Sequence, residues 1–300
     1  MRKTHAEKSE GGDGPENLYR PKLRRATVRI SGVFPRSRPL PRESSHILRP
    51  PPFAQAPSFC RLQVLSRCSV LHLDILSPMT DASEADLLDG RTLAQAVRTE
   101  VQADIQAWTD DGHRPPFLSA VLVGDNPASQ AYVRGKEKDA AEVGIETETH
   151  HLDADTSQAD LLDLVHDLNA DASVDGILVQ LPLPDHMDER TIIDAVDPSK
   201  DVDGFHPENL GRLMRDNPRY IPATPYGIME MLSRSDIDPE GMDAVIVGRS
   251  NIVGKPLANL LLRRTANATV TVCHSRTRDL AAHTRRADLL VAAAGQAAFI

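Results

Sequence analysis

Short apolar runs alternate with amphipathic segments along residues 88–300, and this alternation constrains the fold more than any other feature of the chain. The runs predicted to form strands are residues 117–123, 146–151, 176–181, 244–247, 268–273 and 288–294. The segments with helical spacing are residues 93–108, 128–143, 157–168, 226–234, 252–264 and 278–286. Strands that alternate with helices predict an α/β fold with largely parallel sheets.

Charge divides the chain into two unlike parts. Residues 1–78 carry 14 Lys and Arg against 6 Asp and Glu, whereas residues 79–300 carry 20 against 37. The first part is rich in Arg and Pro without a sustained period, so we expect a disordered or spurious extension. A basic arm for nucleic acid and an organelle transit peptide are the functional alternatives.

The remaining chain is predicted to form two domains. We place a first α/β domain at residues 79–223 and a second at residues 224–300. The second has the β-α-β-α-β order of the first half of a nucleotide-binding sheet. Because the chain ends just past a strand, we expect this second domain to be incomplete at its C-terminus.

Composition excludes several classes of protein. No run of about 18 apolar residues exists, which excludes a transmembrane helix. Three cysteines without a close pair in residues 79–300 exclude a disulfide scaffold and a Cys-based zinc site, and no metal site is expected. The acidic balance argues against duplex nucleic acid as a partner of this part. We expect a cytoplasmic protein, with an acidic surface typical either of salt adaptation or of a high-GC genome.

A glycine-containing loop lies between a predicted strand and a predicted helix at residues 248–254. It reads Gly-Arg-Ser-Asn-Ile-Val-Gly, so Ser250 replaces the second glycine of the dinucleotide fingerprint and Gly254 comes one residue late. The helix beyond can still offer N–H groups and a positive dipole end to a pyrophosphate. Spacing alone leaves open a βα turn that binds nothing.

The following strand indicates which dinucleotide is preferred. NAD-binding proteins place Asp or Glu at the end of this strand to accept from the ribose 2′-hydroxyl. Here the strand is followed by His274, Ser275 and Arg276, with no carboxylate. Together with Arg249, these residues suit an anionic 2′-phosphate, so NADP is favoured over NAD.

Three polar side chains share one face of the helix predicted at residues 128–143. Ser129, Tyr132 and Lys136 are spaced i, i+3 and i+7, just beyond the end of a strand where α/β sites form. Lys136 is one of only four lysines in residues 79–300. From the spacing alone, a solvated helix face with a half-buried tyrosine is the commoner explanation.

Two further elements favour a functional site. Gln180 stands near the end of a buried strand, where its amide needs a partner, although a contact to a loop would provide one. Residues 200–206 place Asp203 and a second acid in a turn without helical or strand period. A solvated acidic loop would look the same, but a calcium loop would need a longer series of ligands.

Several motifs in the same order resemble the bifunctional methylenetetrahydrofolate dehydrogenase/cyclohydrolase family. The stretches that match are Gly-Asp-Asn-Pro-Ala-Ser at 124–129, Tyr-Val-x-x-Lys at 132–136, Asp-Gly-Ile-Leu-Val-Gln-Leu-Pro-Leu-Pro at 175–184, Lys-Asp-Val-Asp-Gly at 200–204, Thr-Pro at 224–225 and Gly-Arg-Ser-Asn-Ile-Val-Gly-Lys-Pro at 248–256. The family's own dinucleotide loop has this Gly-x-Ser-x-x-x-Gly form. Its C-terminal Pro-Gly-Gly-Val-Gly segment is absent here.

The resemblance implies roles for individual residues. Lys136 is the implied catalytic lysine, Tyr132 contacts the pterin, Gln180 supports the lysine and Asp203 holds the pterin. The other implied substrate-binding residues are Ser129, Val179 and Leu181. The implied NADP-binding residues are Gly248, Arg249, Ser250, Gly254 and Ser275. The family also implies a homodimer formed through the nucleotide domain.

The activity that the resemblance implies is bifunctional and belongs to one-carbon metabolism and purine biosynthesis. NADP-dependent oxidation converts 5,10-methylenetetrahydrofolate to 5,10-methenyltetrahydrofolate, and hydrolysis then yields 10-formyltetrahydrofolate. The hydrolysis needs a proton acceptor, for which Lys136 is suited. Two alternatives stay open: a dehydrogenase of this fold without useful cyclohydrolase activity, and an inactive truncated folate domain with a basic nucleic-acid-binding arm.

Overall fold

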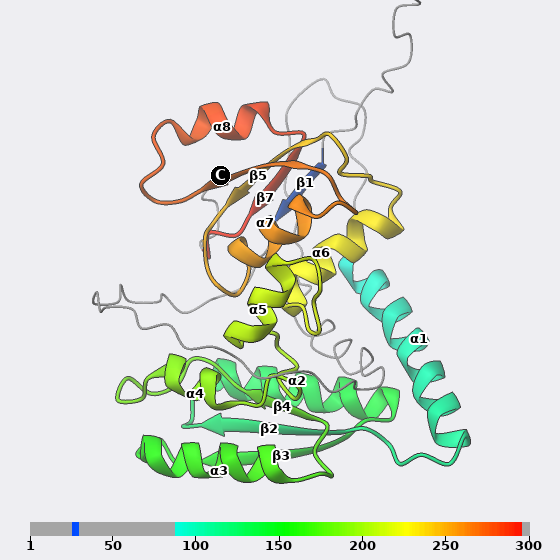
Figure 1. Ribbon diagram of the computed structural model, residues 1–300, viewed down its shortest axis with the longest axis vertical. Helices are drawn as coiled ribbons and strands as arrows, with labels where there is room; N and C mark the ends of the chain where they lie inside the picture. The colour runs from blue at the N-terminus through cyan, green and yellow to red at the C-terminus, as the bar shows by residue number, and fades with distance from the viewer. Residues whose placement is uncertain (1–25, 30–87, 296–300) are drawn as a thin grey trace, which may run out of the picture.

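The computed structural model describes residues 26–29 and 88–295 (Figure 1). Most of the extension predicted to be disordered or spurious therefore lies outside the described residues. Within that extension the structure describes strand β1 (Ala26–Arg29), which pairs in parallel with β7 (Leu289–Ala292). Thr27 and Val28 are β-branched and suit an extended backbone, and the open edge of β7 supplies their hydrogen-bonding partner.

The first sheet has three parallel strands in the order β3-β2-β4. Its strands are β2 (Phe117–Val123), β3 (Glu146–Leu152) and β4 (Gly176–Val179). The helices around it are α1 (Gly90–Asp110), α2 (Pro127–Val143), α3 (Gln158–Ala170) and α4 (Glu189–Ala195). Except for α4, each of these elements was predicted from the apolar pattern, and the observed bounds differ by a few residues.

Alternate residues of β2 face two different layers of helices. Leu118, Ala120 and Leu122 are buried in a core with residues of α1 and α2, such as Val133. Val121 and Val123, which have the opposite parity, are buried against α3 and α4, where Leu161 lies. This is the period-2 alternation of a strand that is buried on both faces, and it gives the unit its three layers.

The second sheet has the order β1-β7-β5-β6. Its remaining strands are β5 (Asp243–Val247) and β6 (Thr269–Cys273). The helices of this part are α6 (Ala223–Arg234), α7 (Gly254–Leu262) and α8 (Leu280–Arg286). Helix α5 (Pro207–Met214) precedes them and contacts α7.

β2 lies between β3 and β4, and β5 lies between β6 and β7, all in parallel. In each case the chain runs from the inner strand to the neighbour on one side and then crosses to the neighbour on the other side. This reversal makes the carboxyl end of β2 and of β5 a topological switch point. Ligands of open α/β sheets bind at such points. The two predicted sites, at residues 124–136 and 248–254, follow these two strand ends.

Helices α4 and α5 were not predicted because they are short and their apolar periodicity is brief. Their ends nonetheless carry capping signals in the sequence. Asp188 accepts a hydrogen bond from the Arg190 N–H at the start of α4. His206 accepts from the Glu208 N–H at the start of α5, where Pro207 occupies the first turn. Capping chemistry alone was therefore a usable signal.

A bidentate ion pair joins α1 to α6. Arg234 donates to both carboxylate oxygens of Glu100, at 2.6 and 2.7 Å, and its Nε lies 3.1 Å from Glu230 of its own helix. The hydrogen bond with Arg234 lowers the pKa of Glu100 below its ordinary value. The pair therefore links a helix of the first sheet to a helix of the second.

We expect Glu100→Gln to lower the free energy of unfolding by about 0.2–1 kcal/mol near neutral pH, the range of exposed ion pairs. Because the pKa of Glu100 is lower in the folded state, this stabilisation is present above the unfolded-state pKa and is lost as the pH falls through the folded-state value. Thermal unfolding of both proteins at neutral and acidic pH checks this. A difference that persists at low pH, or in high salt, would argue against the pair.

Candidate active site

Helix α2 begins at the carboxyl end of β2 with strong capping. The side chain of Asn126 accepts hydrogen bonds from the N–H groups of Ala128 and Ser129, at 2.9 and 3.2 Å, and Pro127 occupies the first turn. These residue types favour a helix start at this point. The sequence thus sets where α2 begins, and with it which of its residues face the sheet.

The three predicted residues of α2 differ in burial. Ser129 is buried, Lys136 is partly buried, and Tyr132 is 36% exposed. Within the described ranges, the Lys136 amine has no hydrogen-bond or ion-pair partner, whereas Lys200 and Lys255 both do. A partly buried amine without a protein partner is available to a substrate.

Gln180 continues β4 by one residue and faces α2. Its N–H donates to the Val121 carbonyl at 2.8 Å, which extends the ladder beyond the strand. Leu178, two residues earlier, packs in the same core as Val133 of α2, so strand alternation directs Gln180 to that face. Its amide Nε2 donates to the Leu181 carbonyl at 2.6 Å, so the partner of this amide is the backbone of the next residue.

Val179 and Leu181 have the opposite orientation. Both pack against the core on the α3 and α4 side of the sheet, where Leu161 and Val165 lie. The structure therefore does not bring their side chains together with Lys136. Any contact of these two predicted residues with a ligand at the α2 face would use their backbone.

The loop at residues 200–206 returns beside β4. Ile177 forms a parallel bridge with Asp201, and its N–H donates to the Lys200 carbonyl at 2.8 Å. Beyond this isolated bridge the loop turns, because the Gly204 N–H donates to the Asp201 carbonyl at 3.2 Å, and Asp203 is partly exposed in this turn. Val202 packs in the core cluster that contains Val133 and Ala140 of α2. Gln180 and Val202, the chain neighbour of Asp203, therefore lie on the α2 side of the sheet.

The side chain of Lys200 anchors the start of this loop to α3. Its ammonium donates to the carbonyls of Leu168, Asn169 and Asp171, at 2.9, 2.8 and 2.6 Å, and so caps the C-terminus of α3. A cation at the carboxyl end of a helix is favoured by the helix dipole. No sequence motif indicates this role, because the partners of Lys200 are backbone atoms.

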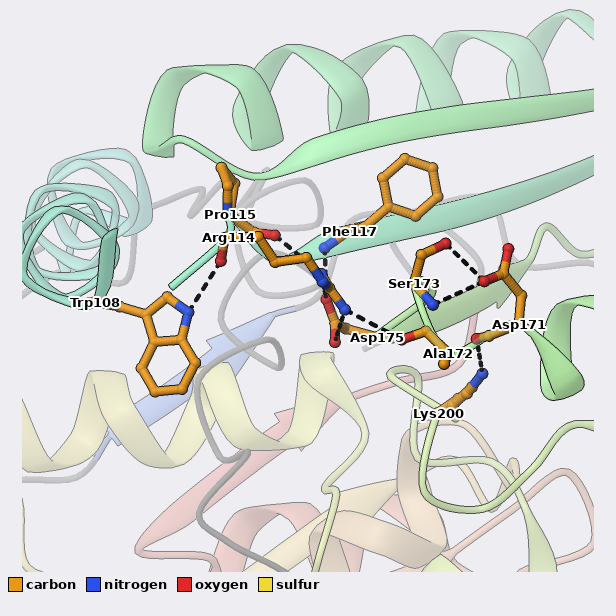
Figure 2. A network of polar contacts seen from close by, with 9 residues as sticks. All are labelled: Trp108, Arg114, Pro115, Phe117, Asp171, Ala172, Ser173, Asp175 and Lys200. Atoms are coloured by element: carbon orange, nitrogen blue, oxygen red, sulfur yellow. Dashed lines mark hydrogen bonds and ion pairs between the residues drawn. The ribbon is translucent and has the colours of Figure 1, made fainter. Parts of the chain in front are cut away.

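Figure 2 shows a network that lies beside this contact. Arg114 forms a bidentate pair with Asp175, at 2.6 and 3.0 Å, and Asp175 also accepts from the N–H of Phe117 at 2.9 Å. The hydrogen bond with Asp175 raises the pKa of Arg114. The pair links the start of β2 to the turn before β4. It thereby stabilises the register of β2 and β4, the two strands next to the candidate site.

The second predicted site is the loop after β5. Gly248 has a φ of +141° and its N–H donates to the Cys273 carbonyl at 2.9 Å. A Cβ on Gly248 would overlap the carbonyl oxygen of Ala293, and a Cβ on Gly254 would overlap that of Gly248. Both glycines are therefore required for close backbone packing. The hydroxyl of Ser250 accepts from the Val253 N–H at 3.0 Å and holds the loop together.

We expect Gly254→Ala to destabilise the protein by about 1–3 kcal/mol, the typical cost of forcing an extra methyl group into packed structure. Gly211→Ala is the matched control, because Gly211 lies within α5 and a Cβ there meets nothing within 4 Å. Thermal unfolding of both variants checks this. Equal stability of the two variants would contradict the close approach of Gly254 to Gly248.

Arg249 and Ser275 occupy equivalent positions past two neighbouring strands. Val247 of β5 pairs with Cys273 of β6, and each predicted residue lies two positions beyond, exposed at the same edge. His274 instead turns into its own loop, where its ring accepts from the Arg276 N–H at 3.1 Å. The structure therefore places Arg249 and Ser275 side by side in register, just past the ends of two neighbouring strands.

The loop fits a dinucleotide but the described residues offer no metal site. Among these residues, the N–H groups of Asn251 and Ile252 have no backbone or side-chain acceptor, and they precede the nine-residue helix α7. Such N–H groups at a helix N-terminus bind phosphate. Within the same ranges, no group of three or more His, Cys, Asp or Glu is arranged to hold a metal ion.

Comparison with known proteins agrees with this geometry. A family model described as the tetrahydrofolate dehydrogenase/cyclohydrolase catalytic domain matches residues 88–203, and one for the family's NAD(P)-binding domain matches residues 222–300. The chain belongs to the tetrahydrofolate dehydrogenase/cyclohydrolase family. The resemblance drawn from the motifs is therefore confirmed.

Individual family members resemble the chain over most of its length. The bifunctional protein FolD of Salinibacter ruber is 92% identical over 222 residues, which are 74% of this chain and 74% of that protein. The crystal structure of FolD from Campylobacter jejuni is 48% identical with a TM-score of 0.68, covering 70% of this chain and 73% of that chain. The Trypanosoma brucei enzyme, solved with NADP cofactor and inhibitor, is 37% identical with a TM-score of 0.68, covering 72% and 73%.

These family structures confirm the predicted two-domain α/β fold. Among the described residues, no helix combines the length and apolar character needed to span a bilayer.

Proposed function

We propose that the protein oxidises 5,10-methylenetetrahydrofolate with NADP and hydrolyses the resulting methenyl compound to 10-formyltetrahydrofolate. The observation that carries this proposal is the Lys136 amine, which is partly buried on α2 and has no hydrogen-bond or ion-pair partner among the described residues. Gln180 and Asp203 are proposed to reach the same site. Membership of the dehydrogenase/cyclohydrolase family supports both steps. The NAD(P)-binding match and the NADP complex of the Trypanosoma brucei relative support the cofactor.

Each residue of the first site has a distinct proposed role. The Asp203 carboxylate accepts hydrogen bonds from the N–H edge of the pterin, a geometry that two carboxylate oxygens fit. Tyr132, partly exposed on α2, stacks against or hydrogen-bonds the substrate. Lys136 accepts a proton when water adds to the methenyl carbon, and Gln180 orients its amine.

The second site binds the cofactor. Bound NADP supplies the hydride acceptor for the dehydrogenase step. The chain's own contribution is orientation: the 248–254 loop and the start of α7 bind the pyrophosphate, and Arg249 and Ser275 bind the 2′-phosphate. No side chain needs to act as a base in this step, because the folate nitrogens expel the hydride.

An assay of both products tests the proposal. The protein is incubated with methylenetetrahydrofolate and NADP, and NADPH, methenyltetrahydrofolate and formyltetrahydrofolate are measured over time. We expect NADPH and formyltetrahydrofolate to rise together. Accumulation of the methenyl compound at its uncatalysed rate of hydrolysis would favour the monofunctional dehydrogenase instead, and absence of NADPH would contradict the proposal.

We also propose that the protein forms a homodimer in the cytoplasm. The family resemblance suggests an interface on the nucleotide domain. In the described sheet, β6 is the edge strand on one side, and Val272 on it is 37% exposed. An open edge strand can pair with another chain. Light scattering after gel filtration measures the mass, and a monomer at micromolar concentration would contradict the dimer.

A further inference from the structure

The family resemblance implies a pterin-binding role for Asp203 in the 200–206 loop. The other acid of this loop, Asp201, has a different environment in the structure. Asp201 is 5% exposed, whereas Asp203 is partly exposed. The Asp201 Oδ1 accepts from the Gly204 N–H at 3.0 Å. Its Oδ2 accepts from the His206 N–H and from the Asn209 amide, both at 2.8 Å. Both oxygens of Asp201 are thus occupied by protein donors.

Two of these donors follow Asp203 in the chain. Gly204 comes directly after it and His206 three residues after it, so the Asp201 carboxylate closes a small ring of backbone that contains Asp203. Gly204 has a φ of +70°, and a Cβ there would lie 3.0 Å from the backbone of Ile221 and Pro222. The path of the loop on the far side of Asp203 is therefore tightly defined.

Asn209 fixes Asp201 in turn. It is fully buried, and its amide donates to the Pro198 carbonyl at 2.9 Å as well as to Asp201. Tyr220, also buried, donates from its hydroxyl to the Ser199 carbonyl at 2.9 Å. Burial raises the pKa of Asp201, and the hydrogen bonds from Asn209 and His206 act in the opposite direction. The donors thus offset part of the cost of burying this acid.

We propose that Asp201, held by Asn209, is a positioning residue that fixes the backbone around Asp203 so that the Asp203 carboxylate meets the substrate. This inference rests on the proposed folate-binding role of Asp203. Asp201 itself is closed off by three N–H donors and cannot contact the substrate. A displacement of about 1 Å at a binding group can reduce activity about 100-fold, so a hydrogen-bonded frame has a large effect.

The test compares Asp201→Asn with Asp203→Asn and with the double variant. In Asp201→Asn, an amide N–H replaces one acceptor oxygen and opposes the donors that face it. We expect the KM for methylenetetrahydrofolate to rise about 10- to 100-fold, with a much smaller change in kcat and an unchanged Kd for NADP. In the Asp203→Asn background, the added substitution should raise the KM by less than about threefold.

Two further variants keep the test informative if Asp201→Asn does not fold. Asn209→Ala removes one donor to Asp201 and should raise the KM about 3- to 10-fold, again only while Asp203 is present. Asp197→Asn is the matched control, because among the described residues the Asp197 carboxylate accepts hydrogen bonds only from Ser199, at 2.7 and 2.6 Å, just before the loop. It should leave the KM within about twofold.

The outcomes separate this inference from the proposed function. Effects of Asp201→Asn and Asp203→Asn that simply add, or a loss of NADP affinity equal to the rise in KM, would show a general structural role and overturn the inference. An unchanged KM in Asp203→Asn would overturn it together with the proposed pterin contact. A wild-type protein that does not consume methylenetetrahydrofolate would overturn the proposed function itself.

Discussion

Replacement of Lys136 by methionine should abolish the hydrolysis of methenyltetrahydrofolate while folate still binds. Methionine keeps most of the length and apolar volume of the side chain but removes the amine. General acid–base catalysis contributes about 10²- to 10⁴-fold, so we expect the cyclohydrolase rate to fall by that factor. Formyltetrahydrofolate production measures the rate, and substrate protection against thermal unfolding measures the retained binding.

Lys138→Met is the control for this substitution. Lys138 is exposed and lies two residues away on α2. Its replacement removes the same charge from the same helix. We expect its cyclohydrolase rate to remain within about twofold of wild type. If Lys136→Met hydrolysed the methenyl compound as fast as Lys138→Met, the proposed proton acceptor would have to be another group.

Replacement of Arg249 by alanine should weaken NADP binding far more than NAD binding. Hydrogen bonds to a charged group contribute about 1.5–3 kcal/mol, which corresponds to a 10- to 100-fold rise in Kd for NADP. NAD lacks the 2′-phosphate, so its Kd should change little. Titration of each cofactor by calorimetry or fluorescence gives the two ratios directly.

Arg264→Ala is the matched control, because Arg264 is exposed just beyond the C-terminal end of α7. This substitution also removes one positive charge. Its effect on NADP should be small and should vanish at high salt, as expected for a distant charge. Equal losses of NADP and NAD affinity in Arg249→Ala would place Arg249 on a part that both cofactors share, such as the pyrophosphate.

Much of the fold could be predicted because local signals agree with the tertiary structure. The strand at 117–123 was predicted with the observed bounds of β2, since its apolar run is bounded by Pro116 and the turn at Gly124. The start of α2 follows from Asn126 and Pro127, which cap and open the helix. Such signals are local and need no knowledge of other parts of the chain.

Other features depended on contacts between distant residues. The four-residue strand β1 forms only by pairing with β7, more than 250 residues away in the chain. The opposed orientations of Gln180 and Val179 follow from alternation, but which face belongs to α2 is decided by packing. In the sequence, Lys200 stands in a turn with two acids, but in the structure its ammonium caps the C-terminus of α3, some 30 residues earlier in the chain.

The sequence by itself determined the order of the strands and helices other than β1, α4 and α5, the family, the two switch-point loops and the residue types available for chemistry. These properties are encoded in local periodicity, capping and short motifs, which act over a few residues. Only the tertiary structure decided that Asp201 is enclosed while Asp203 is presented, although both acids stand in one five-residue motif. The reason is physical: burial and hydrogen-bond donors at each position are supplied by Asn209, Ile221 and β4, whose proximity exists only after the chain has folded.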